Sequence, residues 1–187
     1  MIIKEDKMTY HTNKFSLSLI VSAFLLSGYA QADSANTINF QGEVSDETCS
    51  VAINGNESSP VVLLPTVSKA DLDTSGKTAG KTDFTVGLTG CSGSATTTQI
   101  STVFVGNNVS AAGNLTNTGS AENVEIQMLD TAGTVINLTG GFTGSGDLSL
   151  SANETEKSAT YGAQYFSTGV ATSGTVAASI QYAITYR

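Results

Sequence analysis

The chain has 187 residues, of which 40% are hydrophobic, and 16 acidic against 8 basic side chains give it a formal net charge of −8. An acidic chain is a poor partner for a phosphate backbone, so nucleic-acid binding is disfavoured. Two cysteines and one histidine offer little for a metal site or for a catalytic base. We therefore expect no cofactor, no metal and no enzymatic activity.

The first predicted element is an export signal over residues 1–32. The apolar run Phe15–Leu26 follows Lys14 and precedes the small residues Ala30 and Ala32, which is the order that signal peptides show. At about a dozen residues, this run is shorter than the ~20 that a membrane-spanning helix needs. No later segment comes closer to that length, so we expect no membrane span.

Cleavage after Ala32 would leave 155 residues, 187 minus 32, which is enough for one hydrophobic core but not for two ordinary domains. Three lysines and two acids precede residue 33, so the remainder carries 5 basic and 14 acidic side chains, a net charge of −9. Either Met1 or Met8 could be the true start. We expect a single exported domain.

The two cysteines, Cys49 and Cys91, lie in this exported part. Exported proteins fold where disulfides form and persist, and two cysteines can make only one bridge. The single histidine, His11, would be removed with the leader, which weakens the alternatives of a catalytic thiol and a metal site. A bridge that closes about forty residues would contribute roughly 4 kcal/mol on the loop-closure model. We expect a structural disulfide.

Short apolar alternations separated by turn residues predict an all-β protein beyond residue 33. A helical turn is possible near Val67–Leu72. Several short strands with one bridge are typical of an immunoglobulin-like β-sandwich. Strands are predicted around Ile38–Val44, Val51–Ile53, Val61–Leu64, Phe84–Leu88, Ile100–Val105, Val124–Met128, Val135–Leu138, Tyr161–Phe166 and Val176–Tyr186.

The last predicted strand has one apolar face along its whole length, formed by Val176, Ala178, Ile180, Tyr182, Ile184 and Tyr186, and Arg187 follows it directly. Because no further residues supply a neighbouring strand, we expect its edge to be covered by another molecule. Residues 33–44 form a second alternating segment that is free to pair outside its own fold. The sandwich is thus predicted to lack one strand.

Several segments resemble those of a known family in their order and spacing. The segment Ile38–Val44 precedes Cys49, and Val86–Leu88 leads into Cys91. Further segments are Val124–Asp130 before Gly133, Tyr165–Gly174, and the penultimate Tyr186. In this order and spacing the exported chain resembles the major subunit of type 1 fimbriae, a chaperone-usher pilin, over essentially its whole length.

The resemblance implies a structural subunit that polymerises by donor-strand exchange into a cell-surface fimbria and supports adhesion. A periplasmic pilus chaperone would first fill the groove beside the last strand and hold the carboxylate of Arg187. At the outer-membrane usher, the next subunit's extension would replace it. The implied donor residues are Asn36, Ile38, Phe40 and Gly42, from an extension over residues 33–44. The implied acceptor residues are Gly174, Val176, Ala178, Ile180, Tyr182, Ile184, Tyr186 and Arg187, within a domain over residues 45–187.

Two departures from the family bear on the strength of the fibre. The extension before Ile38 is about four residues shorter than in the family, and Asn36 stands where Gly is usual. Such a donor would bury less apolar surface, which leaves a shaft subunit and a minor or adaptor subunit both open. The cognate chaperone, the usher and the host ligand are not encoded in any motif.

The alternative interpretation is a self-contained secreted β-sandwich that binds carbohydrate or a host protein. Tyr161, Tyr165 and Tyr182 could line a sugar site, although their alternation favours packing in a core or groove. The segment Asp71–Gly76 resembles the start of a calcium loop, but Thr82 stands where such a loop needs Glu.

Overall fold

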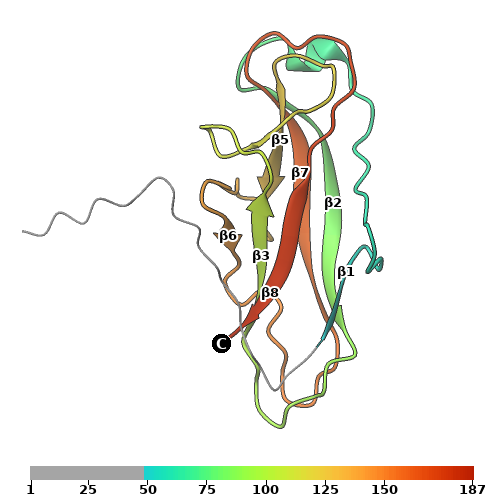
Figure 1. Ribbon diagram of the computed structural model, residues 1–187, viewed down its shortest axis with the longest axis vertical. Coiled ribbons are helices and arrows are strands. Elements are labelled where there is room, and N and C mark those ends of the chain that lie inside the picture. The colour runs from blue at the N-terminus through green and yellow to red at the C-terminus, as the bar shows by residue number, and fades with distance from the viewer. Residues whose placement is uncertain (1–48) are drawn as a thin grey trace, which may run out of the picture. The chain divides into compact units, whose positions relative to one another are not determined.

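The computed structural model describes residues 49–187, which form two antiparallel β-sheets and one turn of 3-10 helix (Figure 1). The leader, the extension and the strand predicted around Ile38–Val44 lie outside the described residues. The elements are β1 (Ser50–Ile53), η1 (Lys69–Leu72), β2 (Thr78–Thr89), β3 (Ile100–Gly106), β4 (Leu115–Thr116), β5 (Val124–Leu129), β6 (Phe142–Thr143), β7 (Lys157–Ser167) and β8 (Ile180–Tyr186).

The larger sheet has the strand order β1-β2-β7-β5-β4. Its long central pair joins β2 to β7, from Leu88 opposite Lys157 to Thr78 opposite Phe166. The register shifts between Ala79 and Thr82, where Gly80 has a φ of +64°. A Cβ atom on Gly80 would lie 2.9 Å from Val67 and 3.0 Å from the ring of Tyr165, so glycine lets the two segments approach there.

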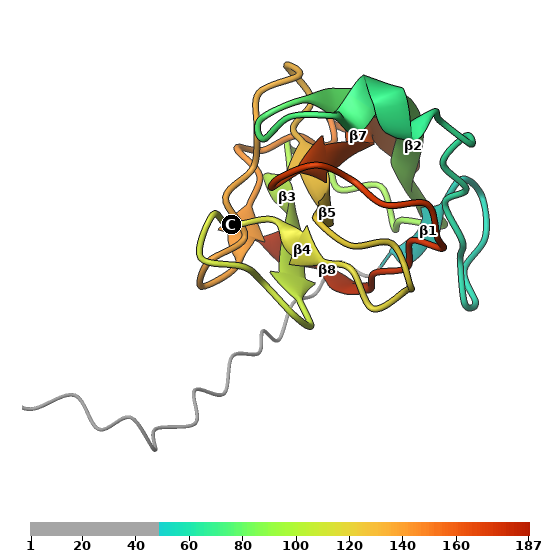
Figure 2. The same ribbon diagram turned by 90° about the horizontal axis from the view of Figure 1, so that it is seen from above.

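The smaller sheet has the order β6-β3-β8, and β8 ends it among the described strands. β3 and β8 pair over seven residues, from Ile100 opposite Tyr186 to Gly106 opposite Ile180. Seen from above, β2 and β7 lie on one side of the molecule and β8 lies on the other (Figure 2). The last strand is therefore held to the domain through one edge.

The core lies between the sheets and follows the alternation of the strands. Phe84, Val86 and Leu88 of β2 are buried, at 6%, 0% and 1% exposure, while their neighbours in sequence are more exposed. The ring of Tyr161 from β7 meets that of Phe104 from β3 edge to face, with centroids 5.0 Å apart. Buried aromatic pairs of this kind join the two sheets.

The predicted disulfide is confirmed. Cys49 and Cys91 are bonded, and they connect the residue before β1 to the second residue after β2. The bridge closes the segment that contains η1 and the stretch before it.

The predicted all-β sandwich is confirmed, and three local predictions differ from the structure. The strand expected over Val61–Leu64 is absent, although the segment is extended. Val135–Leu138 makes only a single bridge, from Val135 to Leu129. The strand expected from Val176 begins at Ile180, because the preceding residues bond to a loop instead of to β3.

The predicted helical turn is present as η1. The side chain of Ser68 accepts a hydrogen bond from Ala70 N–H, and Asp71 accepts one from Ser68 N–H at 3.3 Å. Reciprocal caps of this kind satisfy the free N–H groups at the start of a helical turn.

Candidate functional site

The outer edge of β8 offers free backbone groups. In the ladder with β3, Arg187 N–H donates to Gln99 O at 2.9 Å and Asn107 N–H donates to Ser179 O at 3.4 Å. Bonded pairs alternate along an antiparallel ladder, so the odd-numbered residues of β8 face β3. The N–H and C=O groups of Ile180, Tyr182 and Ile184 therefore point to the opposite edge. No other described strand pairs with that edge.

An extended segment, Pro60–Leu64, forms the opposite wall and is drawn as a plain teal trace in Figure 1. Val62 and Leu64 pack against the core, whereas Val61 and Leu63 are 72% and 81% exposed. That alternation is the pattern of a β-strand. Yet no backbone hydrogen bond joins residues 61–64 to the rest of the described chain. The segment has strand geometry without a partner.

A groove of about 620 Å³ lies between this segment and the residues before and within β8. Its floor belongs to the core and includes Phe104 of β3, Ile126 and Met128 of β5, and Ala163 of β7. Its lining contains no charged side chain. A space that is bounded by two unpaired backbone edges and floored by apolar side chains fits an additional β-strand.

The residues that lead into β8 are held in an extended path by the loop over residues 117–121. Thr118 N–H and Ala121 N–H donate to Ala177 O and Thr175 O at 2.8 and 3.0 Å. The approach is close, because a Cβ atom on Gly174 would lie 2.4 Å from Ala121 N. The loop thus takes the place of β3 for residues 175–177, and it extends the groove beyond the end of the strand.

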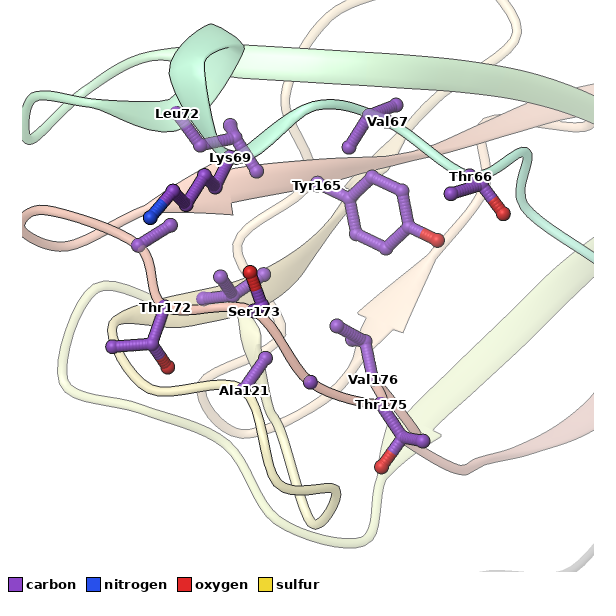
Figure 3. A pocket seen from close by; sticks show the side chains of 13 residues that line it. Thr66, Val67, Lys69, Leu72, Ala121, Tyr165, Thr172, Ser173, Thr175 and Val176 are labelled. Atoms are coloured by element: carbon purple, nitrogen blue, oxygen red, sulfur yellow. The ribbon is translucent and has the colours of Figure 1, made fainter.

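A second cavity of about 460 Å³ continues the groove at this end (Figure 3). It shares Tyr165 and Val176 with the groove. Leu72 and Val124 are buried beneath it, and burial raises the pKa of the Tyr165 hydroxyl above its ordinary value. Lys69, Thr172 and Ser173 also line this end pocket (Figure 3), and all three are exposed. The end pocket is therefore apolar below and polar at its rim.

The structure brings most of the predicted acceptor residues together. Val176, Ala178, Ile180 and Tyr182 line the groove, and Gly174 lines the end pocket. Ile184 and Tyr186 pack against the core further along β8 and line neither cavity, while Arg187 is exposed. The predicted donor residues, Asn36, Ile38, Phe40 and Gly42, lie outside the described residues.

Sequence reasoning missed the second wall and the end pocket. The sequence predicts Val61–Leu64 as an ordinary strand, but the prolines that bound it, Pro60 and Pro65, are a signal for an edge segment because proline cannot donate a ladder hydrogen bond. Nothing in the sequence around Tyr165 indicates that its side chain lines the end pocket. Its position depends on the bulge at Gly80, which the sequence shows only as a glycine in a strand.

The three tyrosines do not gather as a sugar-binding surface. Tyr161 is 1% exposed and donates a hydrogen bond to Asp147 at 2.8 Å, and burial raises the pKa of its hydroxyl. Tyr165 and Tyr182 belong to the groove.

Residues 49–187 contain no group of three His, Cys, Asp or Glu side chains placed to hold a metal ion. None of their helices is long and apolar enough to cross a membrane.

The fold and the groove define a class: an immunoglobulin-like sandwich in which residues 49–187 leave one strand position unfilled. A family model described as "Fimbrial protein" matches residues 38–187. The chain therefore belongs to the fimbrial protein family.

Three relatives illustrate the match. The chain is 38% identical to the F17 fimbrial protein of Escherichia coli over 177 residues, which covers 88% of this chain and 97% of the relative. It is 34% identical to the major fimbrial subunit SMF-1 of Stenotrophomonas maltophilia, with 80% and 91% covered. The type-1 fimbrial protein A chain of Escherichia coli K12 is 29% identical.

Solved structures show the same fold. The P pilus rod subunit PapA superposes with a TM-score of 0.57 at 18% identity, which covers 74% of this chain and 99% of that chain. A chaperone-usher pilus structure gives a TM-score of 0.56 at 18% identity, with 83% and 98% covered. The family and these relatives make the chain a structural subunit of a surface fimbria, which assembles with other such subunits.

Proposed function

We propose that the groove beside β8 is the acceptor site for donor-strand exchange, and that the extension over residues 33–44 of a neighbouring subunit fills it. The observation that supports this most directly is the pair of unpaired walls, the outer edge of β8 and the segment Pro60–Leu64, on either side of an apolar floor. A strand between them would gain backbone hydrogen bonds on both edges and bury its alternate side chains.

The number of alternate residues in the extension also agrees with the number along the groove. Four groove-lining residues of this stretch have the same parity, Val176, Ala178, Ile180 and Tyr182, and Ala177 and Ser179 between them also line the groove. Four donor residues alternate in the extension: Asn36, Ile38, Phe40 and Gly42. In an antiparallel pairing with Gly42 opposite Val176, these two sets face each other residue by residue. Phe40 then lies opposite Ala178, where a small side chain leaves room for an aromatic ring.

The remaining parts of the assembly route follow from the class of protein. Residues 1–32 direct export and are removed, and residues 45–187 form the domain. Before polymerisation, a strand of a periplasmic chaperone occupies the same groove, and basic chaperone residues bind the end of β8 at Arg187. At an outer-membrane usher, the next subunit's extension replaces that strand. Repetition of this head-to-tail contact builds a filament that supports adhesion.

The test is a variant in which a second copy of residues 33–44 follows Arg187 through a short flexible linker, so that it can fold back antiparallel onto β8. Burial of Ile38 and Phe40 contributes about 1.5–3 kcal/mol each. A stabilisation of about 3–6 kcal/mol raises the thermal midpoint of a domain of this size by about 6–24 °C. The variant should also fail to polymerise, because its groove is already filled.

The matched control carries the same addition with Ile38→Ser and Phe40→Ser in the appended copy only. Its composition and length are nearly unchanged, but it has no apolar side chains for the groove. We expect its midpoint to stay near that of the unmodified mature chain. An intact addition that raised the midpoint no more than this control would refute the proposal and favour a complete, self-contained binding module.

A further inference from the structure

Lys69 has an unusual position among the cations of residues 49–187. It is the first residue of η1, it is exposed, and it lines the end pocket (Figure 3). Of the described lysines, Lys81 pairs with Asp83 at 3.1 Å and Lys157 pairs with Glu154 at 3.4 Å. Lys69 forms no ion pair with any residue in that part of the chain. Its ammonium group is thus available to a second molecule.

The surroundings of Lys69 leave its charge uncompensated. No acidic side chain lines either the end pocket or the groove. The nearest carboxylate in sequence, that of Asp71, accepts a hydrogen bond from Ser68 N–H as part of the cap of η1. Among residues 49–187, Lys69 is also the only charged residue in the lining of the two cavities. The rim of the end pocket is therefore a positive point on a chain of negative net charge.

The sequence of the extension supplies the complementary charge. If Gly42 lies opposite Val176, the residues after Gly42 run past Gly174 and toward Thr172, which is the rim where Lys69 lies. Residues 43–47 read Glu-Val-Ser-Asp-Glu, so three of these five side chains are acidic. By contrast, the donor residues that precede them from Asn36 to Gly42 carry no charge. The charged part of the segment and the cation would meet at the same end of the groove.

We propose that Lys69 binds the carboxylates of residues 43–47 of a second copy of this chain, and so fixes the end of the incoming strand. The inference rests on the proposed function, because it needs that strand to enter the groove. Each mature copy has a net charge of −9, so head-to-tail docking brings like charges together. A cation placed where three acids arrive offsets that repulsion locally, and it opposes a donor inserted one step out of register.

The experiment measures the affinity of a labelled synthetic peptide, Asp33–Glu47, for the purified mature chain in low salt. Lys69→Gln should weaken binding about 2–5-fold, as expected for exposed ion pairs, and Lys69→Glu should weaken it further. Lys77→Gln is the matched control, because Lys77 is an exposed lysine that lines neither cavity. This control should bind like the wild type. In about 1 M salt, where the screening length is about 3 Å, the difference should disappear.

A charge exchange makes the test specific to the pair. A peptide with Glu43, Asp46 and Glu47 replaced by lysine should bind the Lys69→Glu chain better than it binds the wild type. Equal affinity of the wild type, Lys69→Gln and Lys69→Glu for the acidic peptide, or a failure of the lysine peptide to prefer Lys69→Glu, would overturn the inference. A peptide that binds none of the chains in either salt would refute the proposed function itself, so the two failures are distinguishable.

Discussion

Strands β2 and β8 share an alternating apolar pattern but have different surroundings. Both alternate apolar residues toward the core: Phe84, Val86 and Leu88 in β2, and Ile180, Tyr182 and Ile184 in β8. β2 has β1 on one edge and β7 on the other, and its three apolar residues are buried. Among the described strands β8 pairs only with β3, and its apolar residues are half-buried. Burial thus follows from the number of neighbouring strands as well as from the pattern.

This difference separates the two roles of the domain. The five-stranded sheet and its contacts with β3 bury their apolar side chains within the domain itself. The edge of β8 and the segment Pro60–Leu64 hold surface that a further strand would bury. A subunit built in this way can be folded and still retain free energy for association, because hydrophobic stabilisation grows with the area removed from water.

The largest effect is expected at the disulfide, which closes the segment containing the Pro60–Leu64 wall. Replacement of Cys49 and Cys91 by alanine should lower the unfolding free energy by about 4 kcal/mol, because the bridge restricts the unfolded chain over a separation of 42 residues. Urea unfolding of the mature chain measures this. Reduction of the wild type should give the same loss, and reductant should not affect the variant. A loss below about 1 kcal/mol would show that the bridge adds little constraint.

A smaller effect is expected where the loop over residues 117–121 holds the entrance to β8. Gly174→Ala places a Cβ atom 2.4 Å from Ala121 N and 2.7 Å from the carbonyl carbon of Ser120, so the backbone must move apart. Overpacking of this kind costs about 1–3 kcal/mol. It should also weaken binding of the peptide Asp33–Glu47, because the displaced segment lines the end pocket.

Gly87→Ala is the control for that substitution. Gly87 lies within β2, and an added Cβ atom would be 3.8 Å from Ala52 O, an ordinary contact. Its substitution should be neutral or slightly stabilising, since alanine restricts the unfolded chain. Equal losses at both glycines would contradict the close approach at Gly174.

The sequence was sufficient for the features that depend on local pattern. Alternation predicted the strands around Phe84–Leu88 and Ile100–Val105, and the cysteine count predicted the bridge. Alternation also predicted that one face of the last strand is apolar. What it could not show is which segment lies across the groove, because Pro60–Leu64 and β8 are separated by more than a hundred residues and meet only through the sandwich.

Two other features could not be predicted from the sequence, for physical reasons. The strand predicted from Val176 begins later because the loop over residues 117–121 binds residues 175–177, and no periodic pattern marks that loop. Val135–Leu138 has a strand-like sequence, but Ile136 and Leu138 instead bury their side chains beside β5 with few ladder bonds. At Ile136 and Leu138, burial satisfies the apolar pattern without a strand.

The smallest effect on the isolated chain is expected at Ile180, and it depends on whether a donor is bound. Ile180 is half-buried in β8, so Ile180→Ala should cost less than about 1.5 kcal/mol in the mature chain alone. Leu88→Ala, in the fully paired β2, should cost about 2–5 kcal/mol. Unfolding in the presence of saturating peptide Asp33–Glu47 should raise the cost at Ile180 toward that at Leu88, because the added strand buries the rest of the side chain. The cost at Leu88 should not change. If the peptide leaves both costs as they were, β8 gains no neighbour from it, and the difference between the two strands would be a fixed property of the fold instead of a site for association.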